Sequence, residues 1–220
     1  MITIEKTQVY GWEAAIRGMR QPYESHSNSD TYFNTSSGVP VIGKNDLALM
    51  MKLCAAGSEH CKFMRMITVT FDLTAPMFFF AQADTYKVGT VRNSTSKMHR
   101  LLAKPFELGD FAAEDLPDVT RGVLQAIIDQ LNAWRQNYLD TPKTHVNTRK
   151  EIWESILRLL PESYHQKSTM LMNYEVLTAI YRQRKGHRLN EWAMFLDWIR
   201  SLPYSELITG EADEDRTANV

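Results

Sequence analysis

A regular row of apolar residues in the middle of the chain constrains the fold more than any other feature. These residues recur at steps of three and four along the sequence: Val119, Val123, Ile127, Leu131, Trp134 and Tyr138. A helix with 3.6 residues per turn places side chains at this spacing along one side. Residues 119–138 therefore predict a long amphipathic helix.

Segments on both sides of this helix predict strands as well as further helices. Strands are expected at 1–10, 62–74 and 168–176, and helices at 11–20, 45–56, 149–160, 177–185 and 188–202. In the second strand, alternating apolar residues from Ile67 to Leu73 predict one buried face. The aromatic segment 75–87 fits either a helix with Pro76 in its first turn or a continued strand. The fold class is thus α/β or α+β.

Polar residues and glycines indicate where several of these helices begin and end. Asn45 is the predicted N-cap of the second helix, and Gly57 is expected to end it. Thr148 and Glu151 have the spacing of a capping box before the 149–160 helix. Gly186 interrupts the pattern after the 177–185 helix.

The chain predicts one domain with two irregular segments. Its 220 residues are 44% hydrophobic, enough for a substantial core, and residues 1–209 are expected to form a single α/β domain. Residues 21–43, rich in Ser, Asn, Pro and Gly, predict a long loop, ordered or partly mobile. The acidic tail 210–220 is expected to be disordered.

Composition argues against several classes of function. The 25 Lys and Arg balance 26 Asp and Glu, so no global field for nucleic acid or an anionic membrane is expected. No apolar run approaches the ~20 residues that span a bilayer, and residues 1–10 lack the apolar core of a secretory signal. Cys54 and Cys61 are expected to stay reduced. A cytoplasmic location follows as an expectation.

Two basic clusters are the strongest candidates for a binding function. Their Lys, Arg and His residues are Lys87, Arg92, Lys97, His99 and Arg100, and then Arg182, Arg184, Lys185, His187 and Arg188. The first cluster also holds several Ser and Thr hydroxyls. Guanidinium groups fork onto phosphate oxygens and hydroxyls add neutral donors, so the mixture suits a phosphorylated small molecule. The alternative interpretation is a pair of solvated faces.

Common catalytic and metal-binding motifs are absent from the sequence. Neither glycine-rich phosphate-loop pattern occurs, and His99 and His187 have no second ligand at metal-binding spacing. His60 precedes Cys61 directly, but adjacent side chains rarely face each other productively. No metal is therefore expected, and no catalytic residue is assigned.

An ordered series of polar residues leads from the second strand to the first basic cluster. His60 stands sixteen residues before Pro76, "APMFFFAQ" ends at Gln82, and 85–87 read Thr-Tyr-Lys. The series resembles the flavin-dependent thymidylate synthases, in which a histidine, an Ala-Pro dipeptide, a glutamine and an Arg-His-Arg triplet follow in this order. These enzymes methylate the uracil ring of dUMP with methylenetetrahydrofolate and a reduced flavin.

The family's hallmark closes with a Ser…Asn…Ser…Arg series, and two registers of this chain fit it. Without a gap, Thr90 and Thr95 take the two serine positions and Lys97 takes that of the arginine. With one inserted residue, Asn93 and Ser96 recover the Asn-x-x-Ser spacing instead. Both registers stay open.

The C-terminal part of the chain extends the resemblance. "LLP", ending at Pro161, resembles the Leu-Pro before a strand in the family, and Asn173 takes the place of the asparagine that opens the next helix. Arg184, eleven residues later, takes the place of a nucleotide-contacting arginine. Arg188 lies near "NEW", which resembles a Gln-Trp-Glu segment, and Arg158 is one residue from another arginine position.

The resemblance implies a mixed, mainly antiparallel small sheet packed with long helices, and a homotetramer. It implies FAD as cofactor, with methylenetetrahydrofolate and NADPH as co-substrates. It assigns nucleotide contacts to Gln82, Asn93, Thr95, Ser96, Lys97, Arg158 and Arg184. It assigns cofactor contacts to His60, Lys87, Thr90, Asn173 and Arg188.

Two departures from the family pattern keep a second function open. Only Lys87 retains a cation in the triplet, and Ala179 stands where the family has a second asparagine. The first hypothesis is a one-carbon transfer to dUMP or a related pyrimidine nucleotide. The alternative is a protein that binds or senses such a nucleotide without flavin turnover. A nucleic-acid-binding module ranks third because the net charge is balanced.

Overall fold

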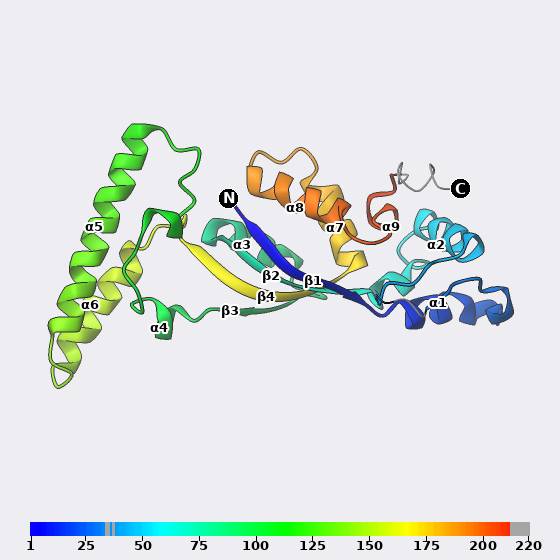
Figure 1. The fold of residues 1–220 in the computed structure, drawn as a ribbon, viewed down its shortest axis with the longest axis horizontal. Coiled ribbons are helices and arrows are strands. Elements are labelled where there is room, and N and C mark those ends of the chain that lie inside the picture. Colours follow the sequence, from blue (N-terminus) through cyan, green and yellow to red (C-terminus); the bar gives the residue numbers. More distant parts are fainter. Residues whose placement is uncertain (34–35, 37, 212–220) are drawn as a thin grey trace. The chain divides into compact units, whose positions relative to one another are not determined.

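The computed structural model describes residues 1–33, 36 and 38–211, and its strands form a small sheet (Figure 1). Within these residues the sheet is four-stranded, in the order β1-β2-β4-β3, with neighbouring strands antiparallel. The strands are β1 (Thr3–Tyr10), β2 (Thr68–Pro76), β3 (Val91–Ser94) and β4 (His165–Asn173). The predicted fold class, a small antiparallel sheet with long helices, is confirmed.

Helices account for most of the remaining regular structure. The α-helices are α1 (Trp12–Arg20), α2 (Lys44–Ala56), α3 (Met77–Ala83), α4 (Lys97–Arg100), α5 (Asp118–Asp140), α6 (Val146–Leu159), α7 (Tyr174–Arg184), α8 (Asn190–Arg200) and α9 (Glu206–Thr209). Short 3₁₀ helices are η1 (Gln21–Tyr23), η2 (His26–Asn28), η3 (Lys62–Arg65), η4 (Asp84–Tyr86) and η5 (Leu108–Asp110). Among the described residues, no helix has the length and apolar character needed to cross a membrane.

The chain divides into two compact units that alternate along the sequence. The hairpin unit comprises Met1, Thr74–Ala83 and Ser94–Ser168, and the sheet unit comprises Ile2–Leu73, Asp84–Asn93 and Thr169–Val220. Strands β2 and β4 each supply residues to both units. A single domain over 1–209 stays a prediction. Residues 212–220 of the predicted acidic tail lie outside the described residues.

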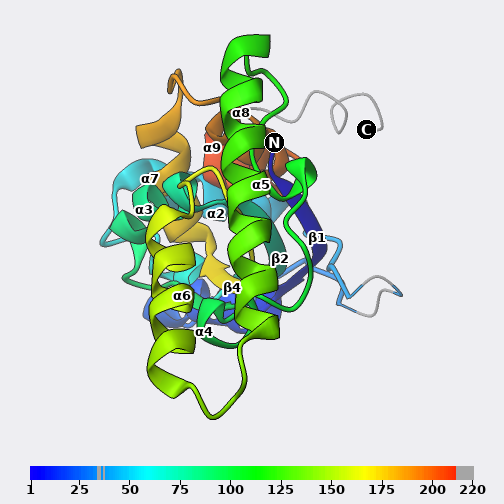
Figure 2. The same cartoon turned by 90° about the vertical axis from the view of Figure 1, so that its left-hand side faces the viewer.

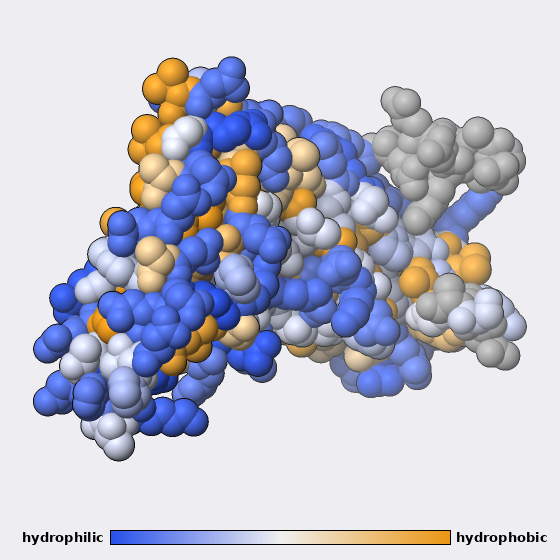
Figure 3. Space-filling model, turned by 60° about the vertical axis from the view of Figure 1, so that its left-hand side comes forward, coloured by the Kyte–Doolittle hydropathy of each residue, from blue (hydrophilic) through white to orange (hydrophobic). Residues whose placement is uncertain are grey.

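In the hairpin unit, α5 and α6 lie side by side (Figure 2). Their buried core includes Leu124, Ile128 and Ile156. The long helix predicted from the apolar row is confirmed as α5, but its first two apolar positions stay outside the core. Val119 is 82% exposed and Val123 is 59% exposed. Apolar residues accordingly gather on the surface over the upper part of α5 (Figure 3).

The sheet unit buries an aromatic core between helices and strands. Trp12 packs edge-on against Tyr174 and Tyr204, at centroid distances of 5.4 and 5.3 Å. Residues from Ile67 to Leu73 include the predicted inward-facing series of β2, each member of which is at most 1% exposed. Helix α7 packs against α8 and α9. The alternation in the sequence therefore identified the buried face of β2 correctly.

Several predicted element boundaries were wrong. The first four residues of the 62–74 strand form η3, and the 75–87 segment is helical from Met77. Thr148 lies inside α6, whose N-cap is His145, so the predicted capping box is not formed. Strand β4 begins and ends three residues earlier than predicted. Gly57 and Gly186, by contrast, follow α2 and α7 with positive φ, as expected of helix-ending glycines.

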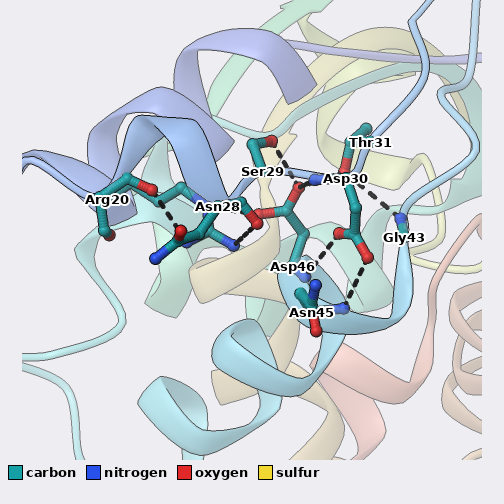
Figure 4. Close-up of polar contacts among 9 residues, drawn as sticks. Arg20, Asn28, Ser29, Asp30, Thr31, Gly43, Asn45 and Asp46 are labelled. Carbon is teal, nitrogen blue, oxygen red and sulfur yellow. Dashed lines mark hydrogen bonds and ion pairs between the residues drawn. The ribbon is translucent and has the colours of Figure 1, made fainter.

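The predicted loop 21–43 is tied to α2 by buried polar contacts (Figure 4). Asp46, fully buried, accepts hydrogen bonds from Arg20 Nε at 2.6 Å, Ser29 Oγ at 2.7 Å and Thr31 Oγ1 at 2.6 Å. The carboxylate of Asp30 accepts the first amides of α2. The predicted cap at Asn45 is therefore wrong, because an acid from the loop caps the helix instead.

Candidate functional site

Arg184 lies at the end of α7, in a cage of aromatic and polar side chains. Its Nε donates to the Tyr86 hydroxyl at 2.9 Å, and its guanidinium carbon lies 4.5 Å from the centre of the Trp192 ring. The Tyr86 hydroxyl donates in turn to Gln183 Oε1 at 3.1 Å. Trp192 is fully buried and Tyr86 is 8% exposed. This cage fixes the direction of a half-buried guanidinium.

Tyr86 is the middle residue of the predicted triplet, and a tight turn follows it. Thr90 Oγ1 donates to the Tyr86 carbonyl at 2.7 Å, and the Thr90 amide donates to the Lys87 carbonyl at 3.2 Å. Lys87 itself is exposed. The hydroxyl of Thr90 thus closes the turn, and Lys87 extends from it.

This turn packs against the start of α7, where Asn173 lies. Asn173 Oδ1 accepts the Val176 amide at 2.9 Å and caps the helix. Gly89 has φ +84°, and a Cβ there would lie 3.0 Å from Val176 Cγ2 and 3.2 Å from Asn173 Nδ2. The structure therefore brings the predicted cofactor residues Lys87, Thr90 and Asn173 to one place in the sheet unit.

His60 is exposed and lines a large pocket in the same unit. The pocket has a volume of about 1250 Å³. Most of its polar lining comes from the end of α1, the loop after it and the start of α2: Arg20, Ser25, Ser27, Asn28, Ser29, Asp30 and Asn45. The segment predicted from composition as a loop therefore lines this pocket together with helix α2 and residues 59–63.

A second cavity lies in the hairpin unit and collects three of the predicted nucleotide residues. Thr95, Ser96 and Lys97 line a space of about 330 Å³. The Nζ of Lys97 lies 3.5 Å from Met77 Sδ, a weak acceptor. A cation and two hydroxyls therefore border one cavity.

The other predicted residues lie at separate places. Gln82 is half-buried on α3, Asn93 is exposed on β3, and Arg188 is exposed before α8. Arg158 is exposed on α6, where it donates to Glu154 at 3.1 Å. Among the predicted nucleotide residues, Asn93 and Arg184 belong to the sheet unit and the rest to the hairpin unit. The predicted nucleotide residues are thus divided between the two units.

Neither cysteine has the electrostatics of a nucleophile. Burial raises the pKa of Cys54 to about 12, and burial also raises the pKa of Cys61. Both thiols are therefore protonated near neutral pH, whereas nucleophilic cysteines have lowered pKa values. Within the described residues, no cluster of His, Cys, Asp and Glu could hold a metal ion.

Sequence reasoning missed the roles of Tyr86 and Trp192. Tyr86 was noted only as a departure in the triplet, and Trp192 only as part of "NEW". Both residues contact Arg184, and Tyr86 lies 98 positions before it in the sequence. The buried-aromatic pattern of α8 was a signal for Trp192, but no local signal pointed to Tyr86.

Comparison with solved structures identifies proteins with the same architecture. Thymidylate Synthase X (ThyX) from Helicobacter pylori, crystallised with FAD and dUMP, matches with a TM-score of 0.65 and 15% identity, over 96% of this chain and 98% of that chain. This chain has the fold of a flavin-dependent thymidylate synthase. A second structure of the H. pylori enzyme with FAD and dUMP matches with a TM-score of 0.65 and 14% identity, over 94% and 97% of the two chains.

No protein-family model and no curated protein sequence matches the chain. The two structural matches nevertheless confirm, for the fold, the likeness to flavin-dependent thymidylate synthases that the sequence indicated. The roles of the individual site residues stay predictions.

Proposed function

We propose that this protein is a flavin-dependent thymidylate synthase-like enzyme. It transfers a one-carbon unit from methylenetetrahydrofolate to dUMP or a related pyrimidine nucleotide, with reduced flavin as the hydride source. The observation that carries the proposal is the caged Arg184, held by Tyr86 and Trp192. The resemblance matches Arg184 to a nucleotide-contacting arginine, and a guanidinium fixed in this way loses little entropy when it binds an anion.

The protein's own part in this reaction is binding and orientation. Thr95, Ser96 and Lys97 supply two hydroxyls and a cation at one cavity, a donor set that suits a phosphate. Arg184 supplies a guanidinium, and Gln82 an amide for the nucleotide. Positioning of this kind supplies much of the rate in reactions where a cofactor carries the chemistry.

The residues of the sheet unit fit a flavin. The pocket beside His60 is large, at about 1250 Å³, and its lining is rich in hydroxyl and amide groups. Lys87 and Thr90 lie on a turn against Asn173, and Arg188 adds a cation. These residues would hold FAD. When bound and reduced, the flavin supplies a hydride, which removes the need for a catalytic cysteine.

Assembly into a homotetramer forms part of the proposal, as do NADPH as reductant and a cytoplasmic location. The exposed Val119 and Val123 on α5 support an assembly, because neighbouring exposed apolar residues favour burial against another chain. Both residues belong to the apolar row that predicted α5, but the core of the hairpin unit does not cover them.

The test is reconstitution of the purified protein with FAD, methylenetetrahydrofolate, NADPH and dUMP. We expect a bound flavin absorbance band and release of tritium from [5-³H]dUMP. Arg184→Ala should abolish most of the release while the flavin band persists. A protein that binds dUMP and FAD yet releases no tritium would refute the proposed reaction.

The second candidate is a protein that binds or senses a pyrimidine nucleotide without flavin turnover. The observation that favours it is Tyr86, which occupies the centre of the triplet and contacts Arg184 and Gln183. This second function predicts a colourless protein whose melting temperature rises with dUMP and does not change with FAD. A yellow protein would exclude it. Oligonucleotide binding that falls steeply with salt would instead indicate the third hypothesis, nucleic-acid recognition.

A further inference from the structure

Two segments of the hairpin unit run side by side next to the 330 Å³ cavity. The Thr95 amide donates to the Lys167 carbonyl at 2.9 Å, and Gln166 Nε2 donates to the Thr95 carbonyl at 2.8 Å. The hydroxyls of Ser94 and Ser168 lie 2.8 Å apart. These hydrogen bonds join residues 94–95 to residues 166–168 and so hold the backbone that borders the cavity in place.

The charges around this cavity are predominantly positive. Lys97, Arg100 and Lys167 line it, and Asp110 is the one acidic side chain in the lining formed by the described residues. The carboxylate of Asp110 pairs with Lys104 at 2.6 Å, which largely neutralises it. The cavity therefore favours an anion.

His165 also lines the cavity but adds no charge near neutral pH. Its Nε2 is buried and has no hydrogen-bond partner among the described residues. Burial lowers the pKa of His165, and the positive N-terminus lowers it further. The positive charge of the cavity thus comes from the lysines and the arginine.

Arg100 is the guanidinium of this lining. It follows Lys97 by three residues on α4, so both side chains lie on the same side of the turn. Within the described part of the chain, the Arg100 guanidinium makes no hydrogen bond or ion pair. The hydroxyls of Thr95 and Ser96 likewise make none there. This leaves one fork-shaped donor and two hydroxyls for a ligand.

The proposed function already assigns the phosphate monoester of the nucleotide to this cavity; we infer that Arg100 is the residue that determines the requirement for phosphate. The inference rests on the proposed function for the identity of the nucleotide. Lys97 presents a single ammonium where the resemblance expects a guanidinium. Arg100, three residues further along α4, supplies the missing bidentate donor. The volume of about 330 Å³ is enough for a phosphate with its sugar.

The test compares dUMP with deoxyuridine, which lacks the phosphate, by isothermal titration calorimetry on the full chain. We expect Arg100→Ala to weaken dUMP binding about tenfold or more and to leave deoxyuridine binding unchanged. The dUMP affinity of Arg100→Lys should lie between those of the unaltered chain and Arg100→Ala, because a lysine keeps the positive charge but lacks the forked pair of donors. Lys143→Ala is the matched control, since Lys143 is an exposed cation of the same unit that does not line the cavity.

The outcomes separate this inference from the proposed function. If Arg100→Ala loses affinity equally for dUMP and deoxyuridine, or loses none for either, the role of Arg100 is wrong. The proposed function would still stand in that case, provided that the unaltered chain binds dUMP. If the chain prefers a purine monophosphate and loses it in Arg100→Ala, the phosphate site stands and the pyrimidine substrate is wrong. Absence of binding to any nucleoside monophosphate would overturn both.

Discussion

At the scale of single residues, the cage around Arg184 depends on one tyrosine hydroxyl. Tyr86 is the middle residue of the predicted triplet, and its hydroxyl joins Arg184 to Gln183. A phenol can accept from a guanidinium and donate to an amide oxygen at the same time. Tyr86 is therefore a positioning residue for Arg184.

Tyr86→Phe tests this role, because it keeps the ring and removes both hydrogen bonds. We expect dUMP affinity to fall by about 0.5–1.5 kcal/mol, against about 1.5–3 kcal/mol for Arg184→Ala. Calorimetric titration measures both. Once Arg184 is alanine, Tyr86→Phe should have no further effect, because the residue it positions is gone.

Additive losses in the double variant would show that Tyr86 acts independently of Arg184. Tyr10→Phe serves as the control, since Tyr10 is an exposed tyrosine whose hydroxyl contacts Gln8. Its dUMP affinity should match that of the unaltered chain.

At the scale of elements, one buried carboxylate, that of Asp46, holds residues 29–31 of the loop after α1. Burial by itself raises the pKa of Asp46, but hydrogen bonds from Ser29, Thr31 and Arg20, with the charge of Arg20, lower it overall. Arg20 also donates to the Ser25 carbonyl at 3.2 Å. The loop is thus held at several points, which explains why a Ser- and Asn-rich segment forms a pocket wall.

Asp46→Asn should destabilise the fold by about 3–5 kcal/mol, because it leaves Arg20 buried without its counter-ion. Urea unfolding measures the loss. The exposed Asp115→Asn is the control and should change stability little. A loss below about 1 kcal/mol would show that the loop is held in other ways.

The stability supplied by Asp46 should depend on pH in one direction. Because its folded pKa lies below the ordinary value, this contribution is full above the unfolded pKa of about 3.9 and is lost as pH falls through the folded pKa. The stability difference between the unaltered chain and Asp46→Asn should therefore shrink as the pH falls below about 4. Urea unfolding at a series of pH values measures it, and a constant difference would contradict the assignment.

At the scale of the whole molecule, two compact units share their strands through the chain. Strands β2 and β4 each continue from one unit into the other. Unfolding one unit therefore removes the ends of strands on which the other depends. This connectivity favours a single cooperative transition.

We expect Asp46→Asn, a change in the sheet unit, to lower the unfolding midpoint of the hairpin unit equally. Hydrogen exchange in rising urea measures opening of α5 and of α7 separately. Coincident midpoints in both helices would agree with a single domain over 1–209. A hairpin unit that keeps its original midpoint would show two independently unfolding domains.

Local periodicity predicted two of the elements. The row from Val119 to Tyr138 predicted α5, and the alternation from Ile67 to Leu73 predicted the buried face of β2. These patterns are readable because a helix or strand repeats its geometry every few residues. The resemblance that predicted the fold was readable for a similar reason, since its motifs are short and in order.

Tertiary structure alone decided the cap of α2, the wall of the large pocket and the cage of Arg184. Asp30 caps α2 from a separate segment, and Tyr86 reaches Arg184 across 98 positions of sequence. Such contacts depend on which distant segments the fold brings together, and the spacing of neighbouring residues does not contain that information. The sequence by itself thus determined the elements and the kind of fold, whereas packing decided which polar groups meet, because hydrogen bonds form only between groups that the fold brings within about 3 Å.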